Sequence, residues 1–245
     1  IDFSGVTFRY EEGVDVLTDF SLKLESGKKY ALVGSSGSGK STIAKLISGF
    51  YPVSSGELKI GGVDISKYKR ETLEHEIAFV FQNAKLFKTS IYKNVKIGRP
   101  DASREEVVKA LDLAMCGSIL DKFEAREDTI IGAKGVHLSG GETQRIAIAR
   151  AILKDAPIII LDEASAASDP ENEYEMQQAF SKLMEGKTVI MIAHRLSSIR
   201  NVDEILVVED GKVTERGSHD ELIVKDSKYK NLQNLYNQAN EWRLS

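Results

Sequence analysis

A glycine-rich run near the N-terminus has the residue types that bind phosphate. Residues 34–41 read GSSGSGKS and fit the pattern G-x-x-x-x-G-K-S. Backbone N–H groups can converge on a phosphate only where no Cβ blocks close approach, which explains Gly37 and Gly39. Lys40 adds a full positive charge for terminal phosphates, and the Ser41 hydroxyl can ligate Mg²⁺. Because the run follows a short apolar segment and opens a helical pattern, we favour a phosphate site over a plain glycine turn.

Two adjacent carboxylates, Asp162 and Glu163, close the apolar segment IIIL. Carboxylates in this position are costly unless they meet a cation or face a cleft. Open α/β sheets bind ligands at the carboxyl ends of their strands, so we expect this pair beside the phosphate loop. There Asp162 would hold Mg²⁺, directly or through water, and Glu163 would orient and deprotonate an attacking water. The alternative is an exposed strand end that opens a loop.

Gln82 and His194 each follow an apolar, strand-like run, IAFVF and TVIMIA respectively. From position alone, a structural histidine and an ordinary loop glutamine remain open alternatives to functional roles. The other histidines, His75, His137 and His219, have no such placement, and we interpret them as structural. The chain has no G-x-S-x-G elbow and no Cys/His spacing typical of a metal site.

A second glycine-rich run, LSGGETQR, spans residues 138–145. Ser139 and Glu142 fit the capping box S-x-x-E, which would simply start a helix. The other possibility is that this helix start also binds a phosphate. If Glu142 accepts from the Ser139 N–H, the amides of Gly140 and Gly141 stay free at the positive end of the helix. We expect the Ser139 hydroxyl to cap the helix or to bind phosphate, but not both in one geometry.

Composition limits the function classes. The chain has 245 residues, of which 42% are hydrophobic, and a formal net charge of −4, which does not suggest a nucleic-acid partner. The single cysteine, Cys116, excludes an internal disulfide, and we interpret it as a small apolar residue late in a helix. No apolar run approaches the ~18 residues that cross a bilayer.

The order of elements predicts an α/β fold. Strand patterns (VTFRY, FSLKLES, YALVG, IAFVFQ) and a Gly-Gly hairpin (GELKIGGVDI) precede a helical block, in which Ser103 and Glu106 form a second capping box. Strands then return as PIIIL, TVIMIA and a hairpin around Asp210 and Gly211. Alternating strands and helices imply a mostly parallel sheet with helices on both faces. We expect the helical block to form a subdomain, and residues 227–245 to form a terminal amphipathic helix.

Taken in order, these motifs resemble the nucleotide-binding domain of an ATP-binding-cassette (ABC) transporter over essentially the whole chain. GSSGSGKST is similar to the family's phosphate loop, LSGGE to its signature and IIILDE to its Mg²⁺ and catalytic-base strand. AASD is similar to its D-loop, IAHRL to its switch histidine, and Gln82 in FVFQNAKLF to its Q-loop. Tyr10, ahead of Val16 and Leu17, is similar to the aromatic residue that stacks on adenine.

The resemblance implies a P-loop NTPase core with a mostly parallel sheet, an N-terminal antiparallel β subdomain and an inserted α-helical subdomain. We expect one nucleotide-binding domain over residues 1–245. Within it, we expect an ATP-binding core (1–87 and 155–230), a helical signature subdomain (88–154) and a C-terminal helical tail (231–245).

The resemblance also assigns roles to residues. It implies catalytic roles for Glu163, Gln82 and His194, the last as a contact to the γ-phosphate. Mg²⁺ would be held by Ser41, Gln82 and Asp162. ATP would be bound by one subunit's Tyr10, Ser36, Gly37, Ser38, Gly39, Lys40, Ser41 and Thr42, and in trans by Ser139, Gly140, Gly141 and Asp169.

The partners implied are a second nucleotide-binding domain, in a head-to-tail homo- or heterodimer with two ATP molecules between, and a transmembrane domain. The segments LFKTSIYKNV, IAHRLSSI and GSHDELI resemble the exporter-type class, in which the membrane domain precedes this one in the same chain. We therefore expect a longer polypeptide ahead of Ile1 and a location at the cytoplasmic face of the cell membrane. ASDPENE resembles a branch that includes siderophore importers with an exporter-type fold.

Three positions depart from the family pattern. Glu142 stands where glutamine is commoner, Ala133 where exporter-type domains usually carry glutamate, and Ser168 where leucine is usual. The first leaves hydrolysis possible, and the other two put the details of coupling in doubt. Two other functions stay open: a soluble ATPase of the same superfamily acting in translation or DNA repair, and a degenerate cassette that holds ATP and only regulates.

Overall fold

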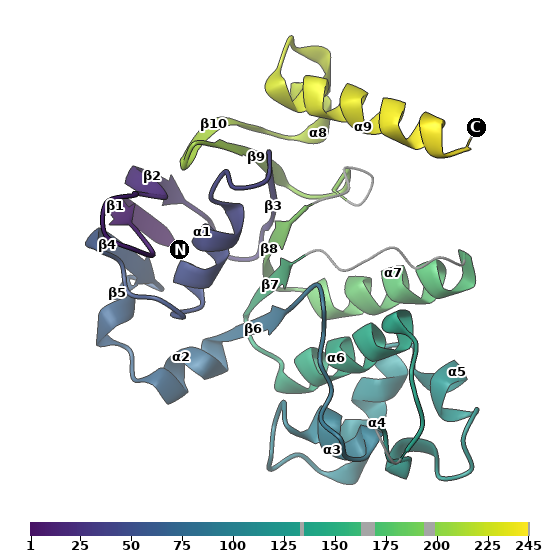
Figure 1. The fold of residues 1–245 in the computed structure, drawn as a ribbon. Coiled ribbons are helices and arrows are strands. Elements are labelled where there is room, and N and C mark those ends of the chain that lie inside the picture. Colours follow the sequence, from purple (N-terminus) through teal and green to yellow (C-terminus); the bar gives the residue numbers. More distant parts are fainter. Residues whose placement is uncertain (133–134, 163–169, 194–198, 245) are drawn as a thin grey trace. The chain divides into compact units, whose positions relative to one another are not determined.

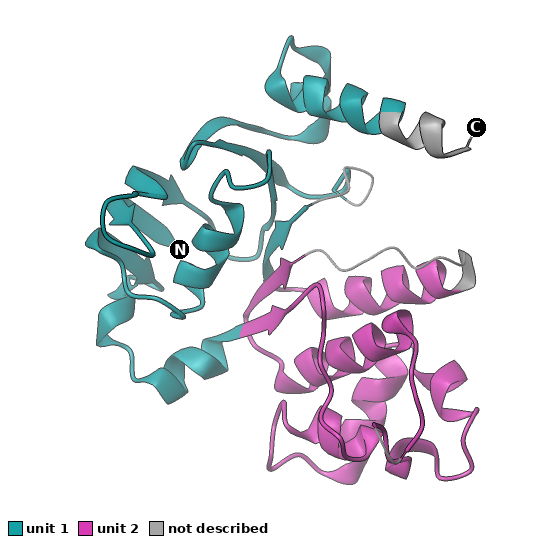
Figure 2. Ribbon diagram, in the orientation of Figure 1, with its two compact units in different colours: residues 1–77, 188–245 teal, residues 78–187 magenta. Residues whose placement is uncertain are grey.

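The computed structural model describes residues 1–132, 135–162, 170–193 and 199–244, with side chains left undescribed for 170–171 and 239–244. Five residues discussed above lie outside these ranges: Ala133, Glu163, Ser168, Asp169 and His194. The chain forms two compact units, one of residues 1–77 and 188–245 and the other of residues 78–187. Figure 2 shows the two units in different colours.

The first unit contains an antiparallel sheet with the strand order β2-β1-β4-β5. Its strands are β1 (Asp2–Phe8), β2 (Leu17–Lys23), β4 (Ser55–Ile60) and β5 (Val63–Asp64). Buried and exposed side chains alternate along parts of β1 and β2, and irregularities in the pairing interrupt the alternation between Phe3 and Val6 and between Leu17 and Phe20. Phe3 lies opposite Leu22 and Leu58, and its ring contacts Phe20 edge-on at 5.2 Å between centroids. This sheet is the predicted N-terminal antiparallel subdomain.

The same unit contributes four strands to a second sheet, in the order β10-β9-β3-β8. They are β3 (Lys29–Val33), β8 (Thr188–Ile192), β9 (Glu204–Glu209) and β10 (Lys212–Gly217). β3 pairs in parallel with both β8 and β9, and β10 pairs with β9 in antiparallel. Tyr30, Ala31, Leu32 and Val33 are all buried, as expected of a parallel strand covered on both faces.

Helices complete the first unit: α1 (Lys40–Ile47), α2 (Arg70–Glu76), α8 (His219–Val224) and α9 (Lys228–Leu244), with a 3-10 turn η1 (Ile65–Lys67). The predicted terminal helix is therefore present as α9. The Glu215 carboxylate accepts from the N–H groups of Lys228 (2.8 Å) and Tyr229 (3.2 Å), which fixes the start of α9 on β10. Tyr229 and Leu222 pack into a core cluster with residues of β3 and β9.

The second unit is mostly helical, around neighbouring strands β6 (Ile77–Val80) and β7 (Ile158–Asp162). Its helices are α3 (Ile91–Lys96), α4 (Arg104–Leu113), α5 (Gly117–Leu120), α6 (Gly140–Lys154) and α7 (Pro170–Met184), with a 3-10 turn η2 (Arg126–Asp128). α6 lies at the centre and packs against α3, α4 and α7 (Figure 1). Ile146, Ile148 and Ala149 are fully buried on α6, so this helix organises the unit.

The predicted fold class is confirmed, since an antiparallel sheet, a mostly parallel sheet and a helical block are all present. Both predicted hairpins form, at the turns after Ile60 and after Glu209. The finer division of the chain into core, helical subdomain and tail stays a prediction. No helix in the described ranges is both long and apolar enough to span a bilayer.

Cys116 differs from its prediction in one detail. It lies not late in a helix but just before α5, because Met115 adopts a positive φ of 55° after α4 has ended. Its side chain is fully buried, and burial raises the pKa of the thiol to about 12. A thiol protonated at physiological pH is a weak nucleophile, which agrees with a structural role.

The capping box of α4 yields a stability prediction. The Ser103 hydroxyl accepts from the Glu106 N–H at 3.2 Å, and the Glu106 carboxylate accepts from the Ser103 N–H at 2.7 Å. We expect Ser103→Ala to lower the free energy of unfolding in urea by about 1 kcal/mol, because an N–H loses its acceptor. Ser103→Asp, which keeps an acceptor at the cap, should restore most of that loss. Equal losses for both variants would show that the cap contributes nothing.

Candidate functional site

The phosphate loop lies between β3 and α1, the strand–loop–helix context predicted for it. Two glycines are required by the fold itself. A Cβ on Gly34 would overlap the Val208 carbonyl oxygen of β9, and Gly39 adopts φ 108° as the residue that precedes α1. Ser36 and Gly37 are exposed at the crest of the loop. The loop therefore sits tightly on the sheet while its crest stays open to a ligand.

The Lys40 ammonium group is folded into this loop. Lys40 is only 4% exposed, and its Nζ donates to the carbonyl oxygens of Gly34 (2.9 Å) and Ser35 (2.7 Å) and to the Ser38 hydroxyl (3.3 Å). A buried ammonium needs such acceptors, since desolvation without partners is costly. The loop thus holds one positive charge at its centre.

The start of α1 differs from those of α4, α6 and α8. Its N-cap residue is Gly39, which has no side chain to cap the helix, and no acidic residue occupies the first turn, whereas α4, α6 and α8 each begin with a serine–glutamate capping box. An uncapped helix start offers backbone N–H groups and the positive end of the helix dipole to an anion. The exposed Ser41 hydroxyl lies in this turn.

The turn between β9 and β10 contacts the phosphate loop, and the sequence did not predict this contact. The Gly211 N–H donates to the Ser38 carbonyl oxygen at 3.0 Å. A Cβ on Gly211 would overlap the Val16 carbonyl oxygen, so the turn packs closely against the start of β2 as well. The turn signal Asp-Gly was visible in the sequence, but nothing local indicates that it contacts the phosphate loop.

Tyr10, the predicted adenine contact, lies in the same unit as the phosphate loop and touches its helix. The Tyr10 hydroxyl and the Thr42 hydroxyl are 3.1 Å apart, within hydrogen-bond distance. Tyr10 is 44% exposed, so part of its side chain remains accessible. The structure therefore brings together two of the residues predicted to bind nucleotide, from positions 32 residues apart in the chain.

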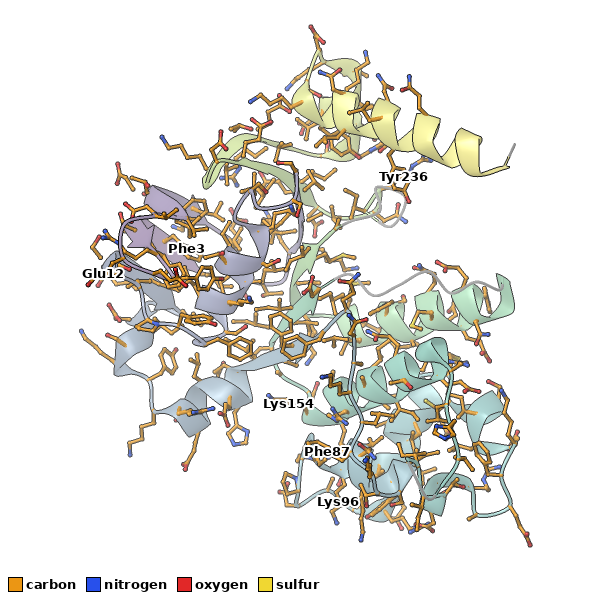
Figure 3. The ribbon with its side chains drawn as sticks, in the orientation of Figure 1. Phe3, Glu12, Phe87, Lys96, Lys154 and Tyr236 are labelled. Carbon is orange, nitrogen blue, oxygen red and sulfur yellow. The ribbon has the colours of Figure 1, made fainter. Side chains whose placement is uncertain are left out.

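In the second unit, Gln82 and Asp162 line one cavity of about 690 Å³. Asp162 ends β7, and Gln82 follows β6 in an exposed segment, as the sequence predicted. Phe87 and Lys154, both labelled in Figure 3, also line this cavity. Carboxylate and amide oxygens at neighbouring strand ends fit the oxygen ligands that Mg²⁺ prefers.

The signature segment forms the predicted capping box at the start of α6. The Ser139 hydroxyl accepts from the Glu142 N–H (3.2 Å), and the Glu142 carboxylate accepts from the Ser139 N–H (2.7 Å). The exposed Lys122 ammonium also donates to Glu142, at 2.6 Å. Burial alone would raise the pKa of Glu142, but the hydrogen bonds from Lys122 and Ser139 outweigh it, and the pKa is lowered. Glu142 is therefore ionised and paired at neutral pH.

The two signature glycines are not needed by the packing of this chain. An added Cβ on Gly140 would meet nothing within 4 Å, and one on Gly141 would meet only ordinary van der Waals contacts at 3.9 Å and beyond. Neither has the positive φ that favours glycine. The absence of side chains at the exposed Gly140 and the half-buried Gly141 therefore has no structural cause in the described part of the chain.

A buried arginine fixes α6, and sequence reasoning did not single it out. Arg145 is 2% exposed and forms an ion pair with Glu175 of α7. It also donates to the Met115 carbonyl oxygen (2.9 Å) and the Asn172 side chain (3.0 Å). These contacts tie the signature helix to α7, the helix that follows the segment predicted as the D-loop.

Comparisons with known proteins agree with this arrangement. Residues 17–166 match the ABC transporter family. The ATP-dependent lipid A-core flippase of Pasteurella multocida is 46% identical over 237 residues, which cover 96% of this chain and 41% of the flippase. The flippase of the same name from Legionella pneumophila is 44% identical over 232 residues, covering 95% and 40%.

A solved structure is also similar. A bacterial Atm1-family ABC exporter with ATP bound matches with a TM-score of 0.87 and 38% sequence identity, over 95% of this chain and 41% of that one. The chain belongs to the ABC transporter family. The exporter-type resemblance is thereby confirmed, while the narrower resemblance to siderophore importers stays a prediction. The chain spans about two fifths of the length of these relatives.

Glu142 gives the site a testable pH dependence. Its pKa is lowered in the folded state, so its contribution to stability is full above the unfolded pKa of about 4.3 and is lost as the pH falls through the lower folded value. We expect Glu142→Gln to lose about 1 kcal/mol at neutral pH, because a charge-assisted hydrogen bond becomes a neutral one. Measured by urea unfolding, the difference from wild type should shrink as the pH falls below the unfolded pKa and disappear once the Glu142 carboxyl group is protonated in the folded state.

The matched control is Lys122→Gln, which leaves the buried carboxylate without its cation. Because Lys122 is 58% exposed, solvent screens its interaction with the buried carboxylate, and we expect a loss of no more than about 1 kcal/mol. The double variant, Lys122→Gln with Glu142→Gln, should recover part of the free energy of unfolding lost in Lys122→Gln. A stability difference between wild type and Glu142→Gln that did not shrink on acidification below the unfolded pKa would contradict the ionised pair.

Proposed function

We propose that this domain binds and hydrolyses Mg-ATP, as one of two such domains that power transport by an attached membrane domain. The observation that carries the proposal is the buried Lys40 ammonium inside a glycine-rich loop, beside an uncapped helix start. A fixed positive charge and converging N–H groups bind a polyphosphate. Membership of the ABC transporter family supports ATP as that polyphosphate.

Each residue of the loop has a role in this proposal. Backbone N–H groups of residues 36–42 would hold the phosphates, and Lys40 would neutralise the terminal ones. The Tyr10 ring would stack on the adenine. Since Gly34 and Gly39 already fix the loop conformation, little ordering is required when the nucleotide binds.

Ser41, Gln82 and Asp162 would hold Mg²⁺ through hydroxyl, amide and carboxylate oxygens, a donor set that suits this ion. Mg²⁺ would bridge phosphate oxygens and neutralise charge that develops on them. Glu163, the residue after β7, would orient and deprotonate the attacking water, and His194 would contact the γ-phosphate. These two roles rest on the sequence pattern.

The signature segment supports a partner domain. Gly140 and Gly141 lack side chains for no reason within the described part of this chain, and they stand at the positive end of a 15-residue helix. We infer that they leave room for the γ-phosphate of ATP held by the partner, with Asp169 contributing in trans. The Ser139 hydroxyl accepts from the Glu142 N–H and still has its own proton to donate. Contrary to the expectation above, it could therefore cap the helix and contact a phosphate at the same time.

The relatives support the link to transport. Both flippases and the solved exporter are more than twice as long as the matched segment, which leaves room for a membrane domain in each. We infer that this chain likewise works at the cytoplasmic face of a membrane, joined to such a domain. ATP would favour the closed pair and hydrolysis would release it, a population shift set by differential contacts.

The alternative of a regulatory cassette that binds ATP without hydrolysing it is separable by mutation. We expect the wild type to release phosphate from ATP and Lys40→Ala to lose ATP binding. Glu163→Gln should still bind ATP but hydrolyse it at least about a hundredfold more slowly. Phosphate release and ATP affinity would be measured on the same preparations. Turnover of Glu163→Gln at the wild-type rate would rule out Glu163 as the base.

The in-trans role of the signature has its own test. Gly140→Asp should leave ATP affinity and the unfolding midpoint unchanged, because a Cβ there meets no atom of the described residues within 4 Å, and should abolish hydrolysis by repelling the partner's γ-phosphate. Ser103→Ala, at the other capping box in the same unit, is the control that should hydrolyse normally. Loss of ATP binding by the Gly140→Asp variant would argue against action in trans.

A further inference from the structure

Three aromatic side chains form a cluster beside the phosphate-loop helix: Phe8, Tyr10 and Tyr51, here called the aromatic cluster. Phe8 ends β1, Tyr10 lies two residues later, and Tyr51 follows α1. The Tyr10 ring meets Phe8 at 4.9 Å and Tyr51 at 5.1 Å between centroids, both nearly perpendicular. Phe8 and Tyr51 also contact each other, at 5.8 Å. Each ring thus touches both others.

The Tyr10 ring is restrained from further directions. Its hydroxyl is within hydrogen-bond distance of Thr42, in the first turn of α1, and the Lys45 ammonium lies 5.6 Å from its ring centroid. Edge-to-face ring pairs, a hydrogen bond and a cation–π contact each restrict the orientation of a ring. An exposed tyrosine without such contacts would sample several rotamers. Tyr10 therefore combines a restrained orientation with a partly accessible side chain.

Fixing a side chain before a ligand arrives removes an entropic cost from binding, about 0.5–1.5 kcal/mol for each side chain ordered. Tyr51 is the member of the cluster best placed for this effect. It is itself 41% exposed, and it follows α1, whereas Phe8 ends β1 and Tyr10 comes two residues later. Its ring also contacts the buried Phe8 ring at 5.8 Å, so the unfolding midpoint of a variant without the Tyr51 ring has to be measured beside its ATP affinity.

We propose that Tyr51 is a positioning residue for the nucleotide base, which holds the Tyr10 ring in its stacking orientation, and that the hydrogen bond between the Tyr10 and Thr42 hydroxyls links the base site to the phosphate loop. This inference rests on the proposed binding of ATP. It assigns a contribution to base recognition to a residue that does not itself stack on the base. It also gives the hydroxyl of Tyr10 a role that stacking alone does not need.

The test compares ATP with inorganic tripolyphosphate, which has the phosphates but no base, by titration calorimetry on the purified chain. We expect Tyr51→Ala to weaken ATP binding about three- to tenfold, the range for loss of an edge-to-face contact, and to bind tripolyphosphate within about twofold of wild type. Tyr51→Phe keeps the ring and is the matched control, with wild-type affinity for both. Tyr10→Ala sets the full effect of losing the stack, about ten- to a hundredfold.

The hydroxyl is tested separately by Tyr10→Phe, which preserves stacking. We expect ATP binding to weaken about two- to fivefold, with tripolyphosphate binding unchanged. A thermal unfolding midpoint close to wild type confirms that each variant is folded.

Three results would overturn the inference. They are wild-type ATP affinity in Tyr51→Ala, equal weakening of ATP and tripolyphosphate in that variant, and a loss in Tyr51→Phe as large as in Tyr51→Ala. The first removes the positioning role, the second makes the role purely structural, and the third assigns it to the hydroxyl of Tyr51. Failure of the wild type to bind ATP at all would instead contradict the proposed function, so the two failures are distinguishable.

Discussion

The phosphate loop depends on the burial of one ammonium group. A lysine head group withdrawn from water needs acceptors on several sides, and here the loop itself supplies two carbonyl oxygens and a hydroxyl. Carbonyls can turn inward only if the loop follows a path that Gly34 and Gly39 permit. That path is in turn supported by the β9–β10 turn through the Gly211 N–H. The sheet, the β9–β10 turn and the two glycines therefore all help to hold the loop in the conformation that stabilises the buried Lys40 ammonium group.

The signature helix also contains buried charged groups that are compensated by nearby partners. Glu142 is a buried carboxylate, and Lys122 together with the Ser139 N–H compensates it. Arg145, one helical turn further on, is a buried cation compensated by Glu175. Each charge is thus compensated by groups of its own compact unit. Under the proposed function, the phosphate loop would bind this chain's own ATP, and the signature segment would meet the ATP of the partner.

The sequence predicted the features that are local and missed those that are not. The capping boxes of Ser103 and Ser139 and the turn at Gly211 follow from residues within a few positions of one another, so their patterns were readable. The contacts of Lys122 with Glu142, of Arg145 with Glu175 and of Gly211 with Ser38 join residues 20, 30 and 173 positions apart. No local pattern records such pairs. Cys116 was misplaced because one positive φ at Met115 ended a helix early.

Gly140 has a further consequence for how damage to this protein would appear in a cell. A Cβ there meets no atom of the described residues within 4 Å, so a variant with a small side chain would fold and accumulate normally and would escape quality control, which recognises instability. In the proposed pair, such a subunit would join normal partners and disable the site that it shares with them. The defect would therefore be genetically dominant, whereas a change that unfolds the phosphate loop would be recessive.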